Sequence, residues 1–348
     1  MNRQFLAFRG IAILIVLVNH SITIGLMMAG KLGYPQPPLV QQVIFTTLVE
    51  FGLFAVPIFL FLSGAFFVYS SQAGSFKQSY KTVWVNLVRV AWPYIIWSLV
   101  FYLMVYLLFE ERYSVTQYLK DLVVGYPYNF VPILMVFYLL APILVWAAKK
   151  FPVLLILFFG VLQLLEANLT HPGLLQFVMP AWTHALEIPV LRNPLADWGI
   201  YFPLGVVVAV YRKSMAPWLD RLKLAILVGT IVLFITALLS DLGILKFPLA
   251  DTLCPMVGML LIPLVRRESI PFVQHLEFLG KRAYGLYLTN LVILNVLIFV
   301  LQNSFQQMLG IYPLVVPFLF AATLALQLVI MQQVERFPKA NVYRYVFG

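Results

Sequence analysis

Two ionisable residues in the first apolar segment have the types and spacing for chemistry. Arg9 and His20 are eleven positions apart, so on an α-helix they lie within about 20° of each other and about 16 Å apart along the axis. Ionisable groups deep in an apolar segment are costly and usually mark a functional site. The imidazole can take a proton from a hydroxyl group, and the guanidinium can bind an anion. The alternative is that Arg9 extends to the membrane surface while His20 only hydrogen-bonds a neighbouring helix.

Further polar residues follow in the next two apolar segments. Glu50 lies about two turns into the second one, at a depth close to that of His20, where a carboxylate can orient the imidazole. The alternative is a glutamate that reaches water at the outer surface. Arg89 lies inside the third segment, after Lys81, and suggests an anionic partner. Its alternative is an arginine that extends to lipid phosphates.

The elements that position these residues are apolar segments. Of the 348 residues, 62% are hydrophobic and 10% are charged, which excludes a soluble domain because soluble domains carry about 25% charged residues. Segments long enough to cross a membrane, or nearly so, are bounded by charges, Pro or Gly. They cover residues 5–29, 43–70, 83–109, 131–148, 151–166, 197–211, 222–240, 248–265, 283–301 and 311–334.

The basic residues predict the orientation. With a cytoplasmic amino terminus, 18 of the 23 Lys and Arg residues fall on the cytoplasmic side of ten spans, which agrees with the positive-inside rule. We therefore expect an all-α polytopic membrane protein of about ten helices, with both termini cytoplasmic, in the plasma (inner) membrane. The net charge of +10 is explained by topology, and no nucleic-acid partner is expected.

We expect one domain over residues 1–348, with no appended soluble domain and with the first helix retained rather than cleaved as a signal peptide. The longest connection, residues 167–196, contains the apolar piece 174–179, which predicts an interfacial or re-entrant segment covering the site from outside. The single cysteine, Cys254, excludes an internal disulfide and a multi-cysteine metal site. No metal is expected.

The order of these motifs resembles a known family. Four features carry the resemblance: Arg9 and His20 with ten residues between them, the run Val56-Pro57-Ile58-Phe59-Leu60-Phe61-Leu62-Ser63-Gly64, the basic stretch leading to Arg89 and Pro93, and the late run Tyr284-Gly285-Leu286-Tyr287-Leu288-Thr289-Asn290. Together they are similar to the acyltransferase-3 family of integral-membrane O-acyltransferases. The resemblance is collinear over essentially the whole chain. The family often has a histidine at the position of Asn290, and paired arginines where this chain has Asn86 before Arg89.

The resemblance implies transfer of an acyl group, commonly acetyl, from cytoplasmic acyl-CoA to a hydroxyl of a sugar, a lipid-linked glycan or another cell-envelope acceptor. Membrane lipids are the other expected partners. His20 is then the catalytic base, by direct transfer or through an acyl-histidine, and Glu50 orients it. The expected coenzyme-binding residues are Arg9, Lys81 and Arg89, and the expected substrate-binding residues are Asn19, Ser63, Tyr287 and Asn290.

Two other functions fit the composition. A transporter or flippase of a polysaccharide or lipid-linked precursor also needs about ten spans and intramembrane charges. We find no two halves with matching interrupted helices, which such a fold favours. A membrane scaffold explains the apolar segments. It does not explain why Arg9, His20 and Glu50 lie in them, where ionisable side chains are unfavourable in free energy.

Overall fold

The structure, a computed structural model, describes all residues except 1–2, 72–75, 178, 181–182, 184–189 and 337–341. In this part of the chain the regular elements are all helical, and nine helical segments are long and apolar enough to cross a membrane. The expected all-α polytopic membrane fold is therefore confirmed. The principal helices are α1 (Arg3–Lys31), α2 (Leu39–Glu50), α3 (Ala55–Ser71), α4 (Phe76–Leu108), α5 (Val115–Val124), α6 (Phe130–Lys150), α7 (Pro152–Thr170), α8 (Arg192–Trp198), α9 (Tyr201–Val210), α10 (Arg212–Asp241), α11 (Leu249–Gly258), α12 (Val273–Ser304), α13 (Tyr312–Glu335) and α14 (Val342–Phe347).

The second and eighth predicted spans differ from simple helices. The second is divided into α2 and α3 by the 3₁₀ turn η1 (Phe51–Phe54), just before Pro57. The eighth forms α11 followed by the 3₁₀ helix η3 (Met259–Leu264), with Pro255 and Pro263 inside them, and is shorter than the nine spans. Proline explains both interruptions, because it lacks an N–H donor and collides with the carbonyl four residues earlier.

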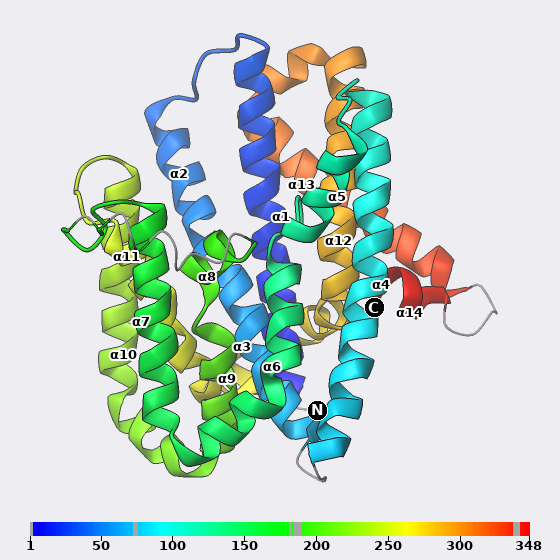
Figure 1. The fold of residues 1–348 in the computed structure, drawn as a ribbon. Coiled ribbons are helices and arrows are strands. Elements are labelled where there is room, and N and C mark those ends of the chain that lie inside the picture. The colour runs from blue at the N-terminus through cyan, green and yellow to red at the C-terminus, as the bar shows by residue number, and fades with distance from the viewer. Residues whose placement is uncertain (1–2, 72–75, 178, 181–182, 184–189, 337–341) are drawn as a thin grey trace.

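The centre of the bundle is α1, which contacts α12, α13, α3 and α2. Figure 1 shows α7, α10 and α11 gathered on one flank and α4 on the other. We call the end of the bundle at which α1 begins the amino-terminal side. At this side a Cβ on Gly10 would collide with the Leu276 carbonyl, and a Cβ on Gly280 with the Leu6 carbonyl. Glycine at these two positions lets α1 and α12 approach each other closely.

A second close crossing joins α3 to α9. A Cβ on Gly64 would collide with the carbonyl of Phe202, and a Cβ on Gly205 with the carbonyl of Phe61. The first crossing holds α12 against α1, and the second holds α3, which also contacts α1, against α9. These are the elements that carry most of the candidate site.

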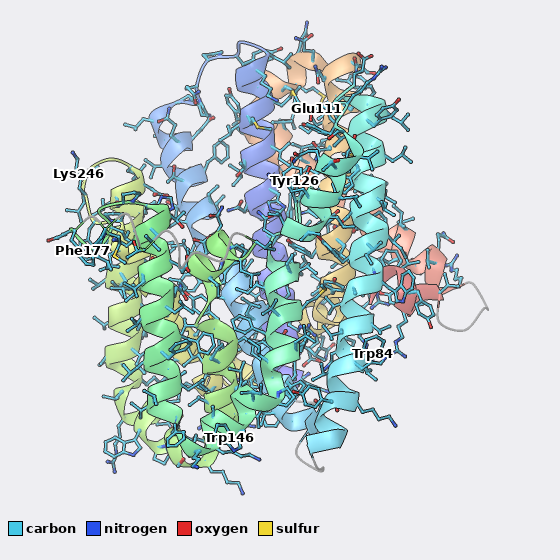
Figure 2. The ribbon with its side chains drawn as sticks, viewed as in Figure 1. Trp84, Glu111, Tyr126, Trp146, Phe177 and Lys246 are labelled. Carbon is cyan, nitrogen blue, oxygen red and sulfur yellow. The ribbon has the colours of Figure 1, made fainter. Side chains whose placement is uncertain are left out.

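Aromatic side chains mark the surface near the amino-terminal side. Trp84 and Trp146 are exposed, and Figure 2 shows them projecting outward there, while Glu111 and Lys246 lie toward the opposite end. Tryptophan is enriched where a membrane meets water. The exposed apolar side chains between these levels are the expected lipid-facing surface.

The long connection is described only in part. Residues 171–177 form turns and bends, and Leu174 is buried in a small cluster with Ala167 and Ala196. The predicted apolar piece 174–179 therefore begins in turns. Residues 178, 181–182 and 184–189 of this connection lie outside the described part of the chain, so the prediction of an interfacial or re-entrant segment stays a prediction.

The long helices differ in length. α4 has 33 residues and α12 has 32, whereas α6 has 21 and α7 has 19. α4 and α12, the two longest helices, both carry residues of the candidate site.

Candidate active site

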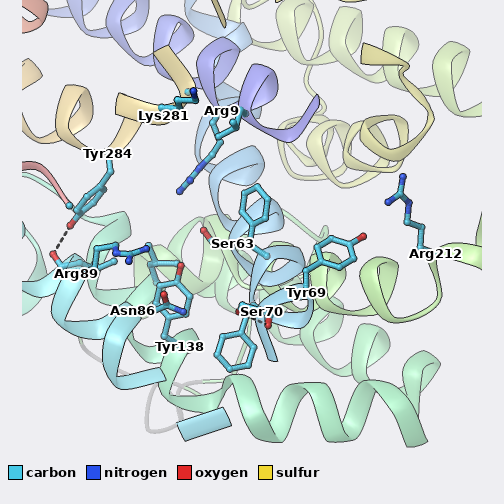
Figure 3. A pocket seen from close by; sticks show the side chains of 17 residues that line it. Arg9, Ser63, Tyr69, Ser70, Asn86, Arg89, Tyr138, Arg212, Lys281 and Tyr284 are labelled. Carbon is cyan, nitrogen blue, oxygen red and sulfur yellow. Dashed lines mark hydrogen bonds between the residues drawn. The ribbon is translucent and has the colours of Figure 1, made fainter. Parts of the chain in front are cut away.

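A cavity of about 740 Å³ lies at the amino-terminal side of the bundle. Its walls come from α1, α3, α4, α6 and α12, with Arg212 at the first position of α10 (Figure 3). This volume falls in the range of pockets that bind small molecules, about 300–1,000 Å³. The polar residues that line it are Arg9, Ser63, Tyr69, Ser70, Asn86, Arg89, Tyr138, Arg212, Lys281 and Tyr284.

The cavity is strongly basic. Arg9, Arg89, Arg212 and Lys281 line it, and none of its described lining residues is acidic. The Arg9 guanidinium carbon is 5.6 Å from the centroid of the Phe66 ring, and its Nε is buried without a hydrogen-bond partner. The last residue of the chain, Gly348, also lines the cavity. Four cations with no acidic side chain in the described lining are suited to bind an anion, and phosphates in particular.

Internal hydrogen bonds hold the cavity walls. The Tyr284 hydroxyl donates to the Val90 carbonyl at 2.7 Å, which joins α12 to α4 beside Arg89. The Ser63 hydroxyl lines the cavity and donates to the Phe59 carbonyl of its own helix at 2.7 Å. The first bond joins two walls of the cavity, and the second occupies the Ser63 hydroxyl within its own helix.

His20 contacts α12 farther along the bundle. Its ring Nδ1 is 2.7 Å from the Asn290 amide nitrogen. α1 and α12 run parallel, because Gly10 meets Leu276 near their beginnings and His20 meets Asn290 ten residues beyond Gly280. His20 is partly buried and Asn290 is fully buried. The structure thus brings together two predicted site residues from opposite ends of the sequence.

Buried side chains brace the segment that carries Asn290. Gln327 of α13 donates to the Leu286 carbonyl at 2.6 Å and to the Thr289 hydroxyl at 2.7 Å. Tyr128 donates to the Leu288 carbonyl at 2.6 Å. Because these partners come from separate elements, they restrict both the rotation and the translation of α12 beside His20.

Glu50 lies on a different face. It is buried, and its carboxyl group is close to those of Asp241 and Asp251, at the end of α10 and in α11. The described contact at His20 Nδ1 is with Asn290 instead. The predicted depth of Glu50 is compatible with this position, but its side chain faces α10 and α11 because α2 lies between them and α1.

Asn19 and Lys81 lie outside the cavity. The Asn19 amide donates to the Val49 carbonyl at 3.1 Å, and Gly52 leaves room for it. Asn19 therefore joins α1 to the end of α2. Lys81 is exposed on α4 and is absent from the cavity lining.

Seven of the ten polar lining residues were not among the predicted site residues: Tyr69, Ser70, Asn86, Tyr138, Arg212, Lys281 and Tyr284. Arg212 and Lys281 were counted only for topology, and Tyr138 lies in an apolar helix without other polar signals. Lys281 is three residues before Tyr284, so both lie on one face of α12. That spacing was the feature of the sequence that could have identified Lys281 as a residue of the site.

One of three comparisons with known proteins identifies the family of this chain. No curated protein and no solved structure matches the chain. A family model described as "Acyltransferase domain", that of the acyltransferase-3 family, matches residues 4–332. This match covers nearly the whole chain, including all but the first residue of α1, the helices that form the cavity walls and the Asn290 segment. The chain therefore belongs to the acyltransferase-3 family, and it is a membrane acyltransferase.

Proposed function

We propose that this acyltransferase takes an acyl group, with acetyl the expected one, from cytoplasmic acyl-CoA and transfers it to a hydroxyl of a sugar or lipid-linked glycan of the cell envelope. The observation that carries the proposal is the basic cavity, because CoA presents phosphate groups to be bound. The amino-terminal side is then the cytoplasmic side of the plasma (inner) membrane, and both termini are cytoplasmic.

The positions along α1 support one binding mode. Arg9 lines the cavity, and His20 lies about 16 Å farther along the same helix. The phosphates of the donor bind among Arg9, Arg89, Arg212 and Lys281, and its flexible arm extends toward His20. Ser63 and Tyr287 lie along this direction. Lys81 is exposed beyond the cavity, so in this proposal it acts only on the approach of the anionic donor.

The chemistry is proton transfer coupled to acyl transfer. His20 takes the proton of the acceptor hydroxyl while the oxygen forms a bond to the thioester carbonyl carbon. The carbon–sulfur bond then breaks, and the sulfur leaves with the proton that His20 holds. The products are an ester and free CoA, and His20 returns to its neutral form. Asn290 has the orienting role first expected of Glu50, because Asn290 contacts the ring.

The test is the release of CoA thiol from acetyl-CoA by the purified protein in liposomes, with water or an added sugar supplying the hydroxyl that takes the acyl group. We expect His20→Ala to lower the rate by about 10²–10⁴-fold, the usual contribution of a general base. Arg9→Ala is expected to raise the KM for acetyl-CoA, and added salt should raise the KM of the wild-type protein because it screens the phosphate contacts.

His275→Ala is the matched control, because His275 is exposed on α12 and does not line the cavity. It should behave like wild type. Full activity in a correctly inserted His20→Ala protein would contradict the catalytic role. A wild-type protein that neither binds nor consumes acyl-CoA would overturn the proposed donor.

A further inference from the structure

A small second space continues the basic cavity. It has a volume of about 20 Å³ and shares Arg9, Ser63, Leu134 and Tyr284 with the larger cavity. Its other walls include Phe59, Phe130 and Tyr287, which we call the aromatic constriction. The free volume thus falls from about 740 Å³ to about 20 Å³ where these three rings begin.

The constriction lies between the cavity and His20. On α12, Tyr287 is three residues beyond Tyr284 of the cavity and three residues before Asn290, which contacts His20. Each step of three residues is about 4.5 Å along a helix axis. On α3, Phe59 is likewise one turn from Ser63. A donor arm that extends from the cavity to His20 must therefore bring its acyl end to this level.

The rings of the constriction support one another. The Phe130 and Tyr287 centroids are 4.5 Å apart with their planes at 74°, and Phe59 stacks on Phe130 at 6.0 Å. Tyr287 also contacts the ring of Tyr128 at 5.7 Å, and Tyr128 is fully buried. Interlocked, buried aromatic rings resist displacement, because any one of them moves only if its neighbours also move.

We propose that Phe130 and Tyr287 select the length of the acyl group and restrict the enzyme to acetyl. This inference rests on the proposed function and adds the substrate class of the same site. A space of about 20 Å³ holds one water-sized group, which suits a methyl group and excludes a longer chain. One extra methylene in an apolar pocket is typically discriminated by about 10- to 200-fold.

The experiment compares kcat/KM for acetyl-CoA and butyryl-CoA in wild type, Phe130→Ala and Phe137→Ala. We expect wild type to favour acetyl-CoA by at least about tenfold and Phe130→Ala to reduce that preference by at least about tenfold. Phe137 is the matched control: it lies two turns along α6, is 1% exposed, and stacks on Phe202 at 5.2 Å away from the constriction. Phe137→Ala should keep the wild-type preference.

A second pair, Phe130→Leu and Phe137→Leu, keeps the test decisive where the alanine variants do not fold. Equal acetyl preference in the Phe130 and Phe137 variants, in a protein that consumes acetyl-CoA, overturns the size selection and leaves the proposed function standing. A wild-type protein that accepts both thioesters equally overturns it as well. A wild-type protein that consumes no thioester overturns both proposals.

Discussion

At the residue scale, the contact between His20 and Asn290 sets the possible proton positions on the ring. With the amide nitrogen donating to Nδ1, the proton of a neutral imidazole lies on Nε2, and the buried Asn290 carbonyl oxygen has no partner. A half-turn of the amide places that oxygen against Nδ1, which then carries the proton and leaves Nε2 free to act as a base. An asparagine can support both arrangements.

We therefore predict that Asn290→Leu lowers kcat by about tenfold or more while the KM for acetyl-CoA stays near wild type, because orientation is only part of what a general base contributes. Asn290→Asp should retain more activity, since a carboxylate accepts a hydrogen bond from the Nδ1–H group without having to rotate. Steady-state kinetics of the two variants give the answer. Equal loss in both variants points to a packing role for Asn290.

The sequence revealed some of these residues and not their partners. Arg9 and His20 were identifiable because ionisable groups in an apolar helix are rare. The neighbour of His20 was not predictable from depth, because residues at one depth can face different helices. Glu50 shows this: its side chain faces Asp241 and Asp251. Asn290 was included only through a family resemblance.

At the element scale, the close crossing of α1 and α12 positions both ends of the site. Gly10 and Gly280 occupy the crossing, next to Arg9 and Lys281 of the cavity. The same pair of helices carries His20 and Asn290 about 15 Å farther on. The sequence predicted both helices as membrane spans. It did not predict their crossing, because single glycines in apolar segments do not show which faces of two helices meet.

The crossing predicts a stability difference within one helix. Gly10→Leu should destabilise the protein by about 1–3 kcal/mol or more, because the new side chain meets the Leu276 backbone, which cannot move aside. Gly30→Leu, near the other end of α1, should be close to neutral since a Cβ there meets nothing within 4 Å. Thermal unfolding in detergent compares the two. Similar midpoints for both variants would argue against the tight crossing.

At the scale of the whole molecule, the cavity forms where distant segments converge. Arg9, Arg89, Arg212 and Lys281 come from four helices, and their basic character was predictable while their convergence was not. Nine of the ten predicted spans correspond to helical segments that are long and apolar enough to cross a membrane in the described part of the chain, because a bilayer sets the length of an apolar helix. The interruption of α11 by η3 shows where proline overrides that signal.

The proposed orientation has a direct test, because Cys254, the single cysteine, is fully buried. Lys246→Cys and Ser269→Cys place one exposed thiol in each of two connections that flank α11 and η3. A membrane-impermeant maleimide added to intact cells should label the first variant and not the second. After permeabilisation it should label both. The opposite pattern would place both termini outside.

The unequal lengths of the helices have a mechanical consequence. α7, with 19 residues, is about 28 Å long and matches a hydrocarbon layer of about 30 Å, whereas α4, with 33, is about 50 Å long. Hydrophobic mismatch of this size is relieved by tilting or by letting an end stand in the headgroup region. Arg89 lies about 20 Å from the start of α4. When the far end of α4 is level with the edge of the hydrocarbon layer, Arg89 therefore lies among headgroups and water. In a thicker bilayer Arg89 would lie within the hydrocarbon layer, which makes the lipid composition of the membrane a determinant of donor binding.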